Sequence, residues 1–499
     1  MTEPNHDPGP APAGRISRVW APLGRVTARF QRASRPAFDT TITWFRSGTF
    51  PSQNYLILLA VVIGLLTGFG SVGFILLLRR LTSFAQDSVA GALSVFGPAS
   101  LVLLPAIGGL LAGPLIMRFA KEARGHGVPE VMTALALWGG RIRKRVVVVK
   151  VIASALTIGF GGAAGREGPM VQIGSGIGSA VAQQAGLSAR HVRTLVACGA
   201  AGGIAATFNA PIAGAIFAME VLMGRVHTDF LLVLLTSLSS ALVGRHYLGN
   251  YPAFVAPAYQ LVSPRELPLY FLMGVIIGLA AVLYVRVLYR AEGLFSDLTI
   301  PDALKPAVGG LIVGLVLRFF PQVYGSGLTA MESALWVRFP WELLLGLFAA
   351  ELLANCATLG SGGSGGVFAP SLYMGAMLGG TFGTLAHLLF PAWTATSGAY
   401  AMVGMAAFFA AAAKAPTTAI LILFEMTNDY RIVLPLMAAT VGSVYLSHWL
   451  LPHSIYTLKL RSRGLAFPPN DEPEGPPHGL ESRPQPSETG AGRTSAAGR

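Results

Sequence analysis

The sequence has little charge and almost no cysteine. Only 12% of its 499 residues are Asp, Glu, Lys or Arg, whereas 53% are hydrophobic and the mean hydropathy is +0.58. This composition excludes an ordinary soluble protein and predicts a membrane protein. Both cysteines, Cys198 and Cys356, lie inside apolar segments. They exclude a disulfide framework, and we expect two buried free thiols.

The chain also lacks the short motifs of several enzyme classes. It has no His-Glu-x-x-His zinc pattern and no Walker loop. GGSG at 362–365 has the form found in rhomboid-type intramembrane serine proteases, but that chemistry needs a histidine beside Ser364, and only the remote His387 and His448 are candidates. We therefore expect no enzyme, no metal site and no cofactor, and keep the serine protease as a remote alternative.

Long apolar runs are present instead. Stretches of roughly 20 residues, the length that crosses the hydrocarbon core, recur from Tyr55 to Leu451. We count about ten of them, many interrupted by glycine or proline. Examples are 55–78, 146–164, 230–248 and 432–451. The first run is too long and begins too late for a cleaved signal peptide.

The charge that is present is mostly positive, with 36 Lys and Arg against 23 Asp and Glu. Several arginines lie in the N-terminal segment, 1–54, before the first apolar run. Lys459, Arg461 and Arg463 follow the last apolar run. The positive-inside tendency therefore predicts a multi-pass protein of the cell inner membrane with both termini in the cytoplasm. Because these cations flank apolar runs, we expect anionic membrane lipid as their partner and no nucleic acid. The Pro- and Gly-rich stretch 465–499 is expected to be a disordered cytoplasmic tail.

Similar segments recur about 200 residues apart. PAIGGLLAG at 105–113 returns as PAVGGLIVG at 306–314, and GHGVPEVMTAL at 125–135 returns as GSGLTAMESAL at 325–335. The other echoes are VVIGL with VIIGL, a repeated Pro-x4-Gly-x3-Gly spacing, and a Gly, Ala-Pro, Glu spacing that ends at Glu220 and again at Glu425. Five echoes in the same order predict an internal duplication.

Two repeats whose ends share one side of the membrane are consistent with an inverted pair, each crossing an odd number of times. We predict an all-α membrane protein with a first transmembrane repeat at 55–258 and a second at 259–464. In transporters and channels of this kind the site lies between the repeats, on broken helices. A cation or amino-acid transporter is one alternative, but it would require carboxylates or exposed carbonyls at the midplane.

Three short loops place glycines and a proline before an apolar, helix-like pattern. They are GHGVP at 125–129, GREGP at 165–169 and GGVFAP at 365–370. Such helix starts present free N–H groups and about half a positive charge, which favours anions. One start contributes only ~0.3–2 kcal/mol, whereas an unpaired ion in low dielectric costs tens of kcal/mol. We therefore expect the three loops to converge on one anion site.

Glu167 is an ionisable residue in the middle of the second loop. Placing an ionisable side chain inside a membrane costs free energy, so such a residue is first interpreted as functional. Its carboxylate can occupy the anion site and leave when protonated or displaced, which predicts a gate sensitive to pH, voltage and permeant anion. A structural ion pair with Arg166 is the less favoured alternative, because adjacent side chains rarely face each other on a helix.

These motifs resemble those of the CLC family of chloride channels and chloride/proton antiporters, from about residue 55 to residue 464. The segments that carry the resemblance are GREGP, GGVFAP preceded by GSGGS, FNAPIAG, AKAPTTA with FEMTNDY, and SIYTLKL. The resemblance implies the CLC fold, with about 18 helices, many short or broken, in two inverted repeats. It also implies a homodimer with one pore per subunit, of the bacterial type without CBS domains.

For the site, the resemblance implies chloride as the bound ion and Glu167 as the external gating glutamate. The outer anion site would use backbone N–H groups of Gly165, Arg166, Glu167 and Gly168, and the central site those of Val367 and Phe368 with the Tyr456 hydroxyl. An aromatic residue at the membrane interface is the alternative for Tyr456.

His126 stands where the family usually has a serine that binds the central anion. A neutral imidazole still donates one hydrogen bond, and a protonated one adds a full charge. We predict that selectivity or rate depends on His126. The alternative is a loop histidine that faces cytoplasmic water.

Val221 stands where proton-coupled members carry an inner glutamate, directly after the position matched by Glu220. Valine cannot relay a proton, so the sequence favours a passive voltage- or pH-gated chloride channel. A chloride/proton antiporter or a fluoride exchanger of the same family is the alternative. Glu220 and Glu425 are expected to close helix-end hydrogen bonds within each half.

Overall fold

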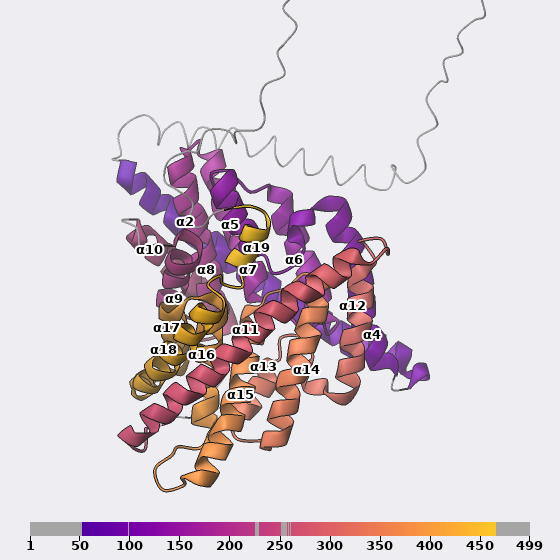
Figure 1. The fold of residues 1–499 in the computed structure, drawn as a ribbon. Coiled ribbons are helices and arrows are strands. Elements are labelled where there is room, and N and C mark those ends of the chain that lie inside the picture. The colour runs from indigo at the N-terminus through magenta and orange to yellow at the C-terminus, as the bar shows by residue number, and fades with distance from the viewer. Residues whose placement is uncertain are drawn as a thin grey trace, which may run out of the picture.

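The structure is a computed structural model that describes residues 52–97, 99–224, 229–250, 257, 259 and 261–465. These residues are helical, with no strand and only two isolated backbone bridges among them. The predicted tails, 1–54 and 465–499, lie almost entirely outside the described residues, as does part of the predicted boundary between the repeats. The all-helical prediction is confirmed (Figure 1).

The first half of the chain extends from α2 to α10. Its helices are α2 (Ser52–Ser83), α3 (Ala90–Ala92), α4 (Ala99–Phe119), α5 (Val128–Leu137), α6 (Lys144–Gly159), α7 (Glu167–Gln184), α8 (Ala189–Phe208), α9 (Pro211–Phe217) and α10 (Phe230–Leu248). A π-helical turn, η5 (Ala218–Met223), continues α9.

The second half extends from α11 to α19 and repeats the same order of long and short helices. Its helices are α11 (Leu267–Asp297), α12 (Lys305–Phe319), α13 (Leu328–Leu335), α14 (Trp341–Gly360), α15 (Phe368–Leu389), α16 (Ser397–Ala413), α17 (Pro416–Thr427), α18 (Val433–Leu450) and α19 (Thr457–Ser462). A 3-10 turn, η7 (Pro321–Val323), joins α12 to the loop before α13.

Seven of the described helical segments are long and apolar enough to cross a membrane. They are Asn54–Val95, Ser100–Phe119, Phe230–Leu248, Pro264–Asp297, Trp341–Gly360, Phe368–Leu389 and Tyr430–Leu450. The count of about ten full-length runs is therefore too high for the described part of the chain. The run expected at 146–164, for example, is the 16-residue helix α6, which stops at Gly159 before a glycine-rich loop.

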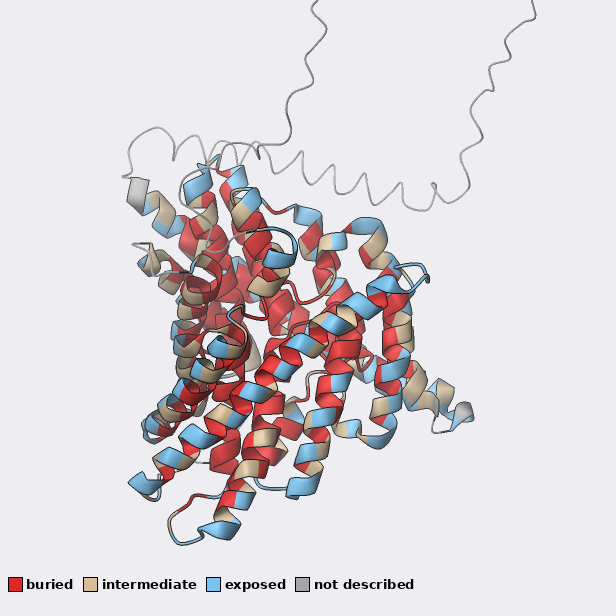
Figure 2. Cartoon of the chain, viewed as in Figure 1, coloured by how far each residue is buried: buried red, intermediate tan, exposed pale blue. Residues whose placement is uncertain are grey.

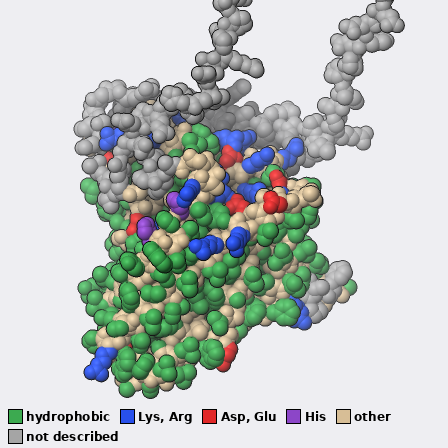
Figure 3. Space-filling model, in the orientation of Figure 1, with side chains coloured by type: hydrophobic (Ala, Val, Ile, Leu, Met, Phe, Trp, Pro, Cys, Tyr) green, Lys and Arg blue, Asp and Glu red, His purple; other side chains and the backbone are tan. Residues whose placement is uncertain are grey.

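The outer surface is apolar, as the bilayer requires. Exposed leucines such as Leu283, Leu315 and Leu353 face outward from long helices, while the interior between the helices is buried (Figure 2). On the face in Figure 3, hydrophobic side chains form a broad belt and charged side chains gather mainly toward one end. This distribution matches a multi-pass membrane protein.

The duplicated segments PAIGGLLAG and PAVGGLIVG pack against each other. In the α4–α12 contact, a Cβ at Gly109 would overlap the carbonyl of Pro306, and a Cβ at Gly310 would overlap that of Pro105. These two contacts are equivalent, because Gly109 and Gly310 occupy the same place in the two copies. Small residues let the two backbones approach closely, as in many membrane helix pairs. The glycines are therefore needed for a two-fold contact between the halves.

Gly165 and Gly366 show that a two-fold axis passes between the copies. The Gly165 N–H donates to the Gly366 carbonyl at 2.8 Å, and the Gly366 N–H donates to the Gly165 carbonyl at 2.6 Å. They are equivalent residues, since each lies four positions before the first-turn proline of its helix, Pro169 or Pro370. Equivalent residues that bond each other reciprocally must lie on either side of the axis.

Glu220 and Glu425 form the third reciprocal contact. Glu425 accepts hydrogen bonds from Ile212 N–H at 3.0 Å and Ala213 N–H at 2.6 Å, at the start of α9. Glu220 accepts from Thr417 N–H at 3.1 Å and Thr418 N–H at 2.7 Å, at the start of α17. The prediction that both carboxylates close helix ends is confirmed, but the prediction that they do so within each half is wrong. Each reaches the other half, because α9 and α17 pack against each other.

Candidate anion-binding site

The three glycine-containing loops converge. Gly125 N–H donates to the Gly363 carbonyl at 3.0 Å, and Gly365 N–H donates back to the Gly125 carbonyl at 3.3 Å. The Gly165–Gly366 bridge joins the second loop to the third. The helices that follow, α5, α7 and α15, therefore begin close to one another near the two-fold axis, as predicted.

Buried polar side chains hold the first loop in place. Lys150, which is fully buried on α6, donates to the carbonyls of Ala123 at 3.1 Å and Gly125 at 2.8 Å. The Ser364 hydroxyl donates to the Ala123 carbonyl at 2.8 Å and lies 2.9 Å from the Ser154 hydroxyl. Lys150 is thus a structural residue, as expected for a cation paired inside a membrane protein.

These partners leave no protease-like site at Ser364. Its hydroxyl lies between Ala123 and Ser154, and no histidine of the described residues hydrogen-bonds to it. His387, one of the two candidates, faces the Thr394 hydroxyl at 3.1 Å instead. The geometry therefore disfavours the serine protease alternative.

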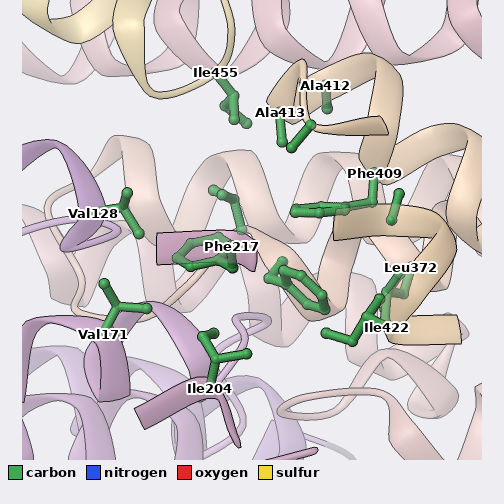
Figure 4. Close-up of a cluster of buried hydrophobic side chains, with 14 of the residues drawn as sticks. Val128, Val171, Ile204, Phe217, Leu372, Phe409, Ala412, Ala413, Ile422 and Ile455 are labelled. Atoms are coloured by element: carbon green, nitrogen blue, oxygen red, sulfur yellow. The ribbon is translucent and has the colours of Figure 1, made fainter. Parts of the chain in front are cut away.

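A small buried cavity lies between the three helix starts. Its lining includes six of the predicted anion-site residues: His126, Glu167, Gly168, Val367, Phe368 and Tyr456. The other walls are apolar and come from α5, α7, α8 and α9: Val128, Val171, Ile204 and Phe217, which appear in Figure 4. As the side chains stand, the space is too narrow for a water molecule.

The Glu167 side chain fills part of this space. It is 1% exposed, and neither carboxylate oxygen has a hydrogen-bond partner among the described residues. The carboxylate faces the backbone N–H groups of Glu167 itself and Ala369 without reaching hydrogen-bond geometry. Within the described chain its one ion pair is long, 3.9 Å from Oε1 to the Arg166 Nε. The pair with Arg166 thus exists, but the carboxylate points at helix starts.

His126 is buried and faces the same cavity. The side chain is 5% exposed, and both ring nitrogens lack a hydrogen-bond partner within the described chain. Its ring centre lies 6.0 Å from that of Tyr456. The alternative of a histidine that faces cytoplasmic water is therefore wrong.

Tyr456 is also buried, at 1% exposure, which excludes a role at the membrane interface. The short helix α19 after it is held by Arg463, which donates to Glu130 and to the Thr133 hydroxyl at 3.2 and 3.0 Å on α5. The Ile455 N–H bonds to the Ala412 carbonyl at 2.8 Å. These contacts carry Tyr456 beneath the first loop.

Two predicted anion-site residues do not line the cavity. The backbone of Gly165 is hydrogen-bonded to that of Gly366. Arg166 lines a larger cavity on the other side of Glu167. Val221 lies in the π-helical turn η5, buried in the core. The apolar walls were missed from the sequence, because nothing distinguishes Val171 or Ile204 from other buried aliphatic residues.

Comparisons with known proteins agree with this geometry. The model of the family described as voltage gated chloride channel matches residues 108–448. The chain belongs to this family. It is 37% identical over 380 residues to a chloride channel protein described as ClcB-like from Ralstonia nicotianae, covering 74% of this chain and 89% of the relative. It is 31% identical over 418 residues to the H(+)/Cl(-) exchange transporter ClcA of Vibrio parahaemolyticus, covering 81% of this chain and 88% of that protein.

Solved structures show the same fold. The crystal structure of a slow cyanobacterial Cl-/H+ antiporter matches with a TM-score of 0.76 and 27% identity, over 83% of this chain and 99% of that one. A CLC-type fluoride/proton antiporter matches with a TM-score of 0.68 and 25% identity, over the same 83% and 99%. The protein is therefore an anion transporter or channel with the CLC fold, and its family is one of transport proteins, not enzymes.

Proposed function

We propose that the chain carries chloride across the membrane through the cavity between the starts of α5, α7 and α15. The observation that carries the proposal is the meeting of three helix starts and Tyr456 around one buried space. Among the described residues, no lysine or arginine lines this space. Backbone N–H groups and helix dipoles favour an anion there without a fixed cation to hold it. Weak binding of this kind lets an ion leave as well as enter.

Glu167 acts as the gate in this proposal. Its carboxylate lies where an anion would meet the N–H groups of α7 and α15, so the carboxylate and the anion compete for the same donors. Protonation removes the charge that holds Glu167 there, and a permeant anion can displace it. Arg166, Glu167 and Gly168 would supply backbone N–H groups to the outer site, because the Gly165 N–H already donates to the Gly366 carbonyl. Val367, Phe368 and Tyr456 would form the central site.

We propose a passive channel. The support is Val221: an apolar side chain at the position of the inner glutamate offers no group to carry a proton from the cytoplasmic side. The relatives differ on this point, since one is named a chloride channel and others are named exchangers or antiporters. A chloride/proton antiporter, or a fluoride-selective one, is the second candidate.

One experiment decides between them. Purified protein is placed in liposomes, and a chloride gradient is imposed while the internal pH is recorded. A passive channel passes chloride without moving protons uphill, whereas an antiporter drives them uphill. Proton pumping would reject the channel, and the absence of any anion flux would reject chloride transport.

We further propose a homodimer in the bacterial inner membrane with both termini in the cytoplasm and anionic lipid around its basic ends. Exposed apolar side chains on α10 and α18, among them Leu242, Val441 and Tyr445, offer a surface for lipid or for a second subunit. Crosslinking in native membranes should give about twice the 52.3 kDa of one chain. Ser462→Cys should stay unlabelled by an impermeant thiol reagent in intact cells, because this topology places residue 462 in the cytoplasm. The two native cysteines are buried and should give no background labelling.

A further inference from the structure

A second, much larger cavity opens on the other side of Glu167. We call it the outer vestibule. Its volume is about 1100 Å³, and its walls are the later turns of α2, the ends of α8 and α10, and the loop from η7 into α13. It lies at the end of α2 away from the N-terminal segment. Arg166 lines it while the next residue, Glu167, lines the small cavity, so the vestibule is the approach to the gate from that side.

The charged side chains that line the outer vestibule in the described part of the chain are all positive. They are Arg79, Arg166 and Arg245, and no described aspartate or glutamate lines it. Arg79 and Arg166 lie close enough to repel each other electrostatically. Glu425 is within electrostatic range of Arg245, but its carboxylate accepts hydrogen bonds from the start of α9. Three like charges that share one cavity favour a counter-anion inside it.

Arg166 and Arg245 use few of their donors on partners in the described part of the chain. Arg166 makes one long hydrogen bond, 3.4 Å to the Thr207 carbonyl. Its Nε has no hydrogen-bond partner within the described chain and makes only the long ion pair, 3.9 Å, to Glu167. Arg245 bonds through Nε to Asn209. The fork of an arginine presents five N–H donors whose spacing fits the oxygens of a carboxylate or phosphate group.

The duplication supplies a further set of donors. Residues 325–329 are the second copy of the loop that carries His126, and they line the vestibule. Ala164 N–H holds this loop through the Gly325 carbonyl at 3.0 Å, as Gly365 N–H holds Gly125 in the other copy. Among the described backbone hydrogen bonds, the first that closes α13 comes from Met331 N–H to the Gly327 carbonyl. The earlier N–H groups of α13 and the Ser326 and Thr329 residues thus border the vestibule.

We propose that the outer vestibule binds a polyvalent oxyanion, a polycarboxylate or a polyphosphate, and that the bound anion obstructs access to Glu167. A single chloride would leave most of about 1100 Å³ to water, whereas drug-sized ligands fill cavities of about 300–1,000 Å³. A carboxylate or phosphate group accepts two parallel hydrogen bonds from a guanidinium fork, and a spherical halide does not. The binding step stands independently of chloride transport, and the obstruction rests on the proposed function.

The binding test uses the full chain, purified in detergent, with citrate and pyrophosphate as separate probes in isothermal titration calorimetry. The variant Arg79→Gln/Arg245→Gln removes two guanidinium groups and leaves Arg166 beside the gate intact. Arg80→Gln is the matched control, because Arg80 is exposed next to Arg79 and does not line the vestibule. We expect binding to weaken about tenfold or more in the double variant, equivalent to about 1.4 kcal/mol, and to be unchanged in the control.

Equal affinity in the double variant and the control, or no heat with either probe at millimolar concentration, would overturn the site. The preferred probe identifies the source class, carboxylate or phosphate. In liposomes, the same probe should reduce wild-type chloride flux and leave the flux of the double variant unaffected. If the probe binds but does not change the chloride flux, the proposed obstruction of Glu167 is wrong and the proposed binding site stands. A protein that binds citrate but passes no chloride would reject the proposed function alone.

Discussion

The two copies in this chain are alike in some positions and different in others, and the pattern of difference separates structure from function. Gly109 matches Gly310, and Glu220 matches Glu425, and each pair makes the same contact twice. These matched positions hold the halves together across the two-fold axis. A contact that must be made from both sides requires the same residue in both copies.

At two positions where the copies differ, the residues face a cavity. The equivalent of Glu167 is Phe368, and both line the small cavity, one as a gate and the other as a wall. The equivalent of His126 is Ser326, but His126 faces the small cavity and Ser326 the outer vestibule. An inverted pair sends equivalent loops toward opposite sides of the membrane, so one copy of a loop can serve each entrance.

The largest expected effect is at the matched glycines. Gly109→Ala and Gly310→Ala should each destabilise the protein by at least about 2–3 kcal/mol, because the new Cβ meets a backbone carbonyl that cannot move aside. The two effects should be equal. Thermal unfolding of the purified protein measures them, with Gly73→Ala as the control, since a Cβ there meets nothing within 4 Å. Unequal losses would argue against a symmetric contact.

The matched carboxylates should give the next effect. Glu220→Gln and Glu425→Gln each weaken charge-assisted hydrogen bonds to a helix start, at about 1–2 kcal/mol each. Unfolding measured beside the exposed Glu342→Gln should show losses for both variants and none for the control. The loss should be somewhat larger for Glu220→Gln, because Glu220 also accepts a hydrogen bond from the Thr418 hydroxyl at 2.6 Å. If only one variant lost stability, the two contacts would not be equivalent.

Glu167→Gln tests the first unmatched position. The variant is neutral at every pH, so chloride flux at pH 7.5 should rise about tenfold, to the level that the wild type reaches only in acid. The sign follows from the charge: wild-type flux increases as pH falls, because protonation releases the carboxylate from the helix starts. Glu351→Gln, at another buried carboxylate that lines neither cavity, should keep the wild-type pH profile. A Glu167→Gln variant with the same profile would remove Glu167 from the gate.

His126→Ser should give the smallest effect, a change in relative chloride and nitrate flux of about fivefold, equal to about 1 kcal/mol for one hydrogen bond. His126 faces the cavity with both nitrogens free of protein partners in the described chain, so the imidazole is available to a passing anion. His246→Ser, at the exposed end of α10, serves as the control. Unchanged selectivity, rate and pH profile would leave His126 as a wall residue.

Much of the site was predictable because its parts are local. Glycine before proline at a helix start depends on backbone preferences within about five residues, and the loops at 125–129, 165–169 and 365–370 were all found in this way. The walls were not predictable, because Val171 and Ile204 line the small cavity only through their position in the folded chain, beside the two-fold axis. The burial of His126 was also open, because Lys150 and Ser364, which fix its loop, are distant in sequence.

Three properties follow from the sequence alone: the chain spans a membrane, it contains an internal duplication, and particular residues begin the helices around the site. Run length, repetition and turn chemistry are properties of neighbouring residues. The folded chain was needed to show that Glu220 and Glu425 each bond to the other half and that residues 325–329 face a basic outer vestibule. Those outcomes depend on the two-fold axis, which brings together residues about 200 positions apart.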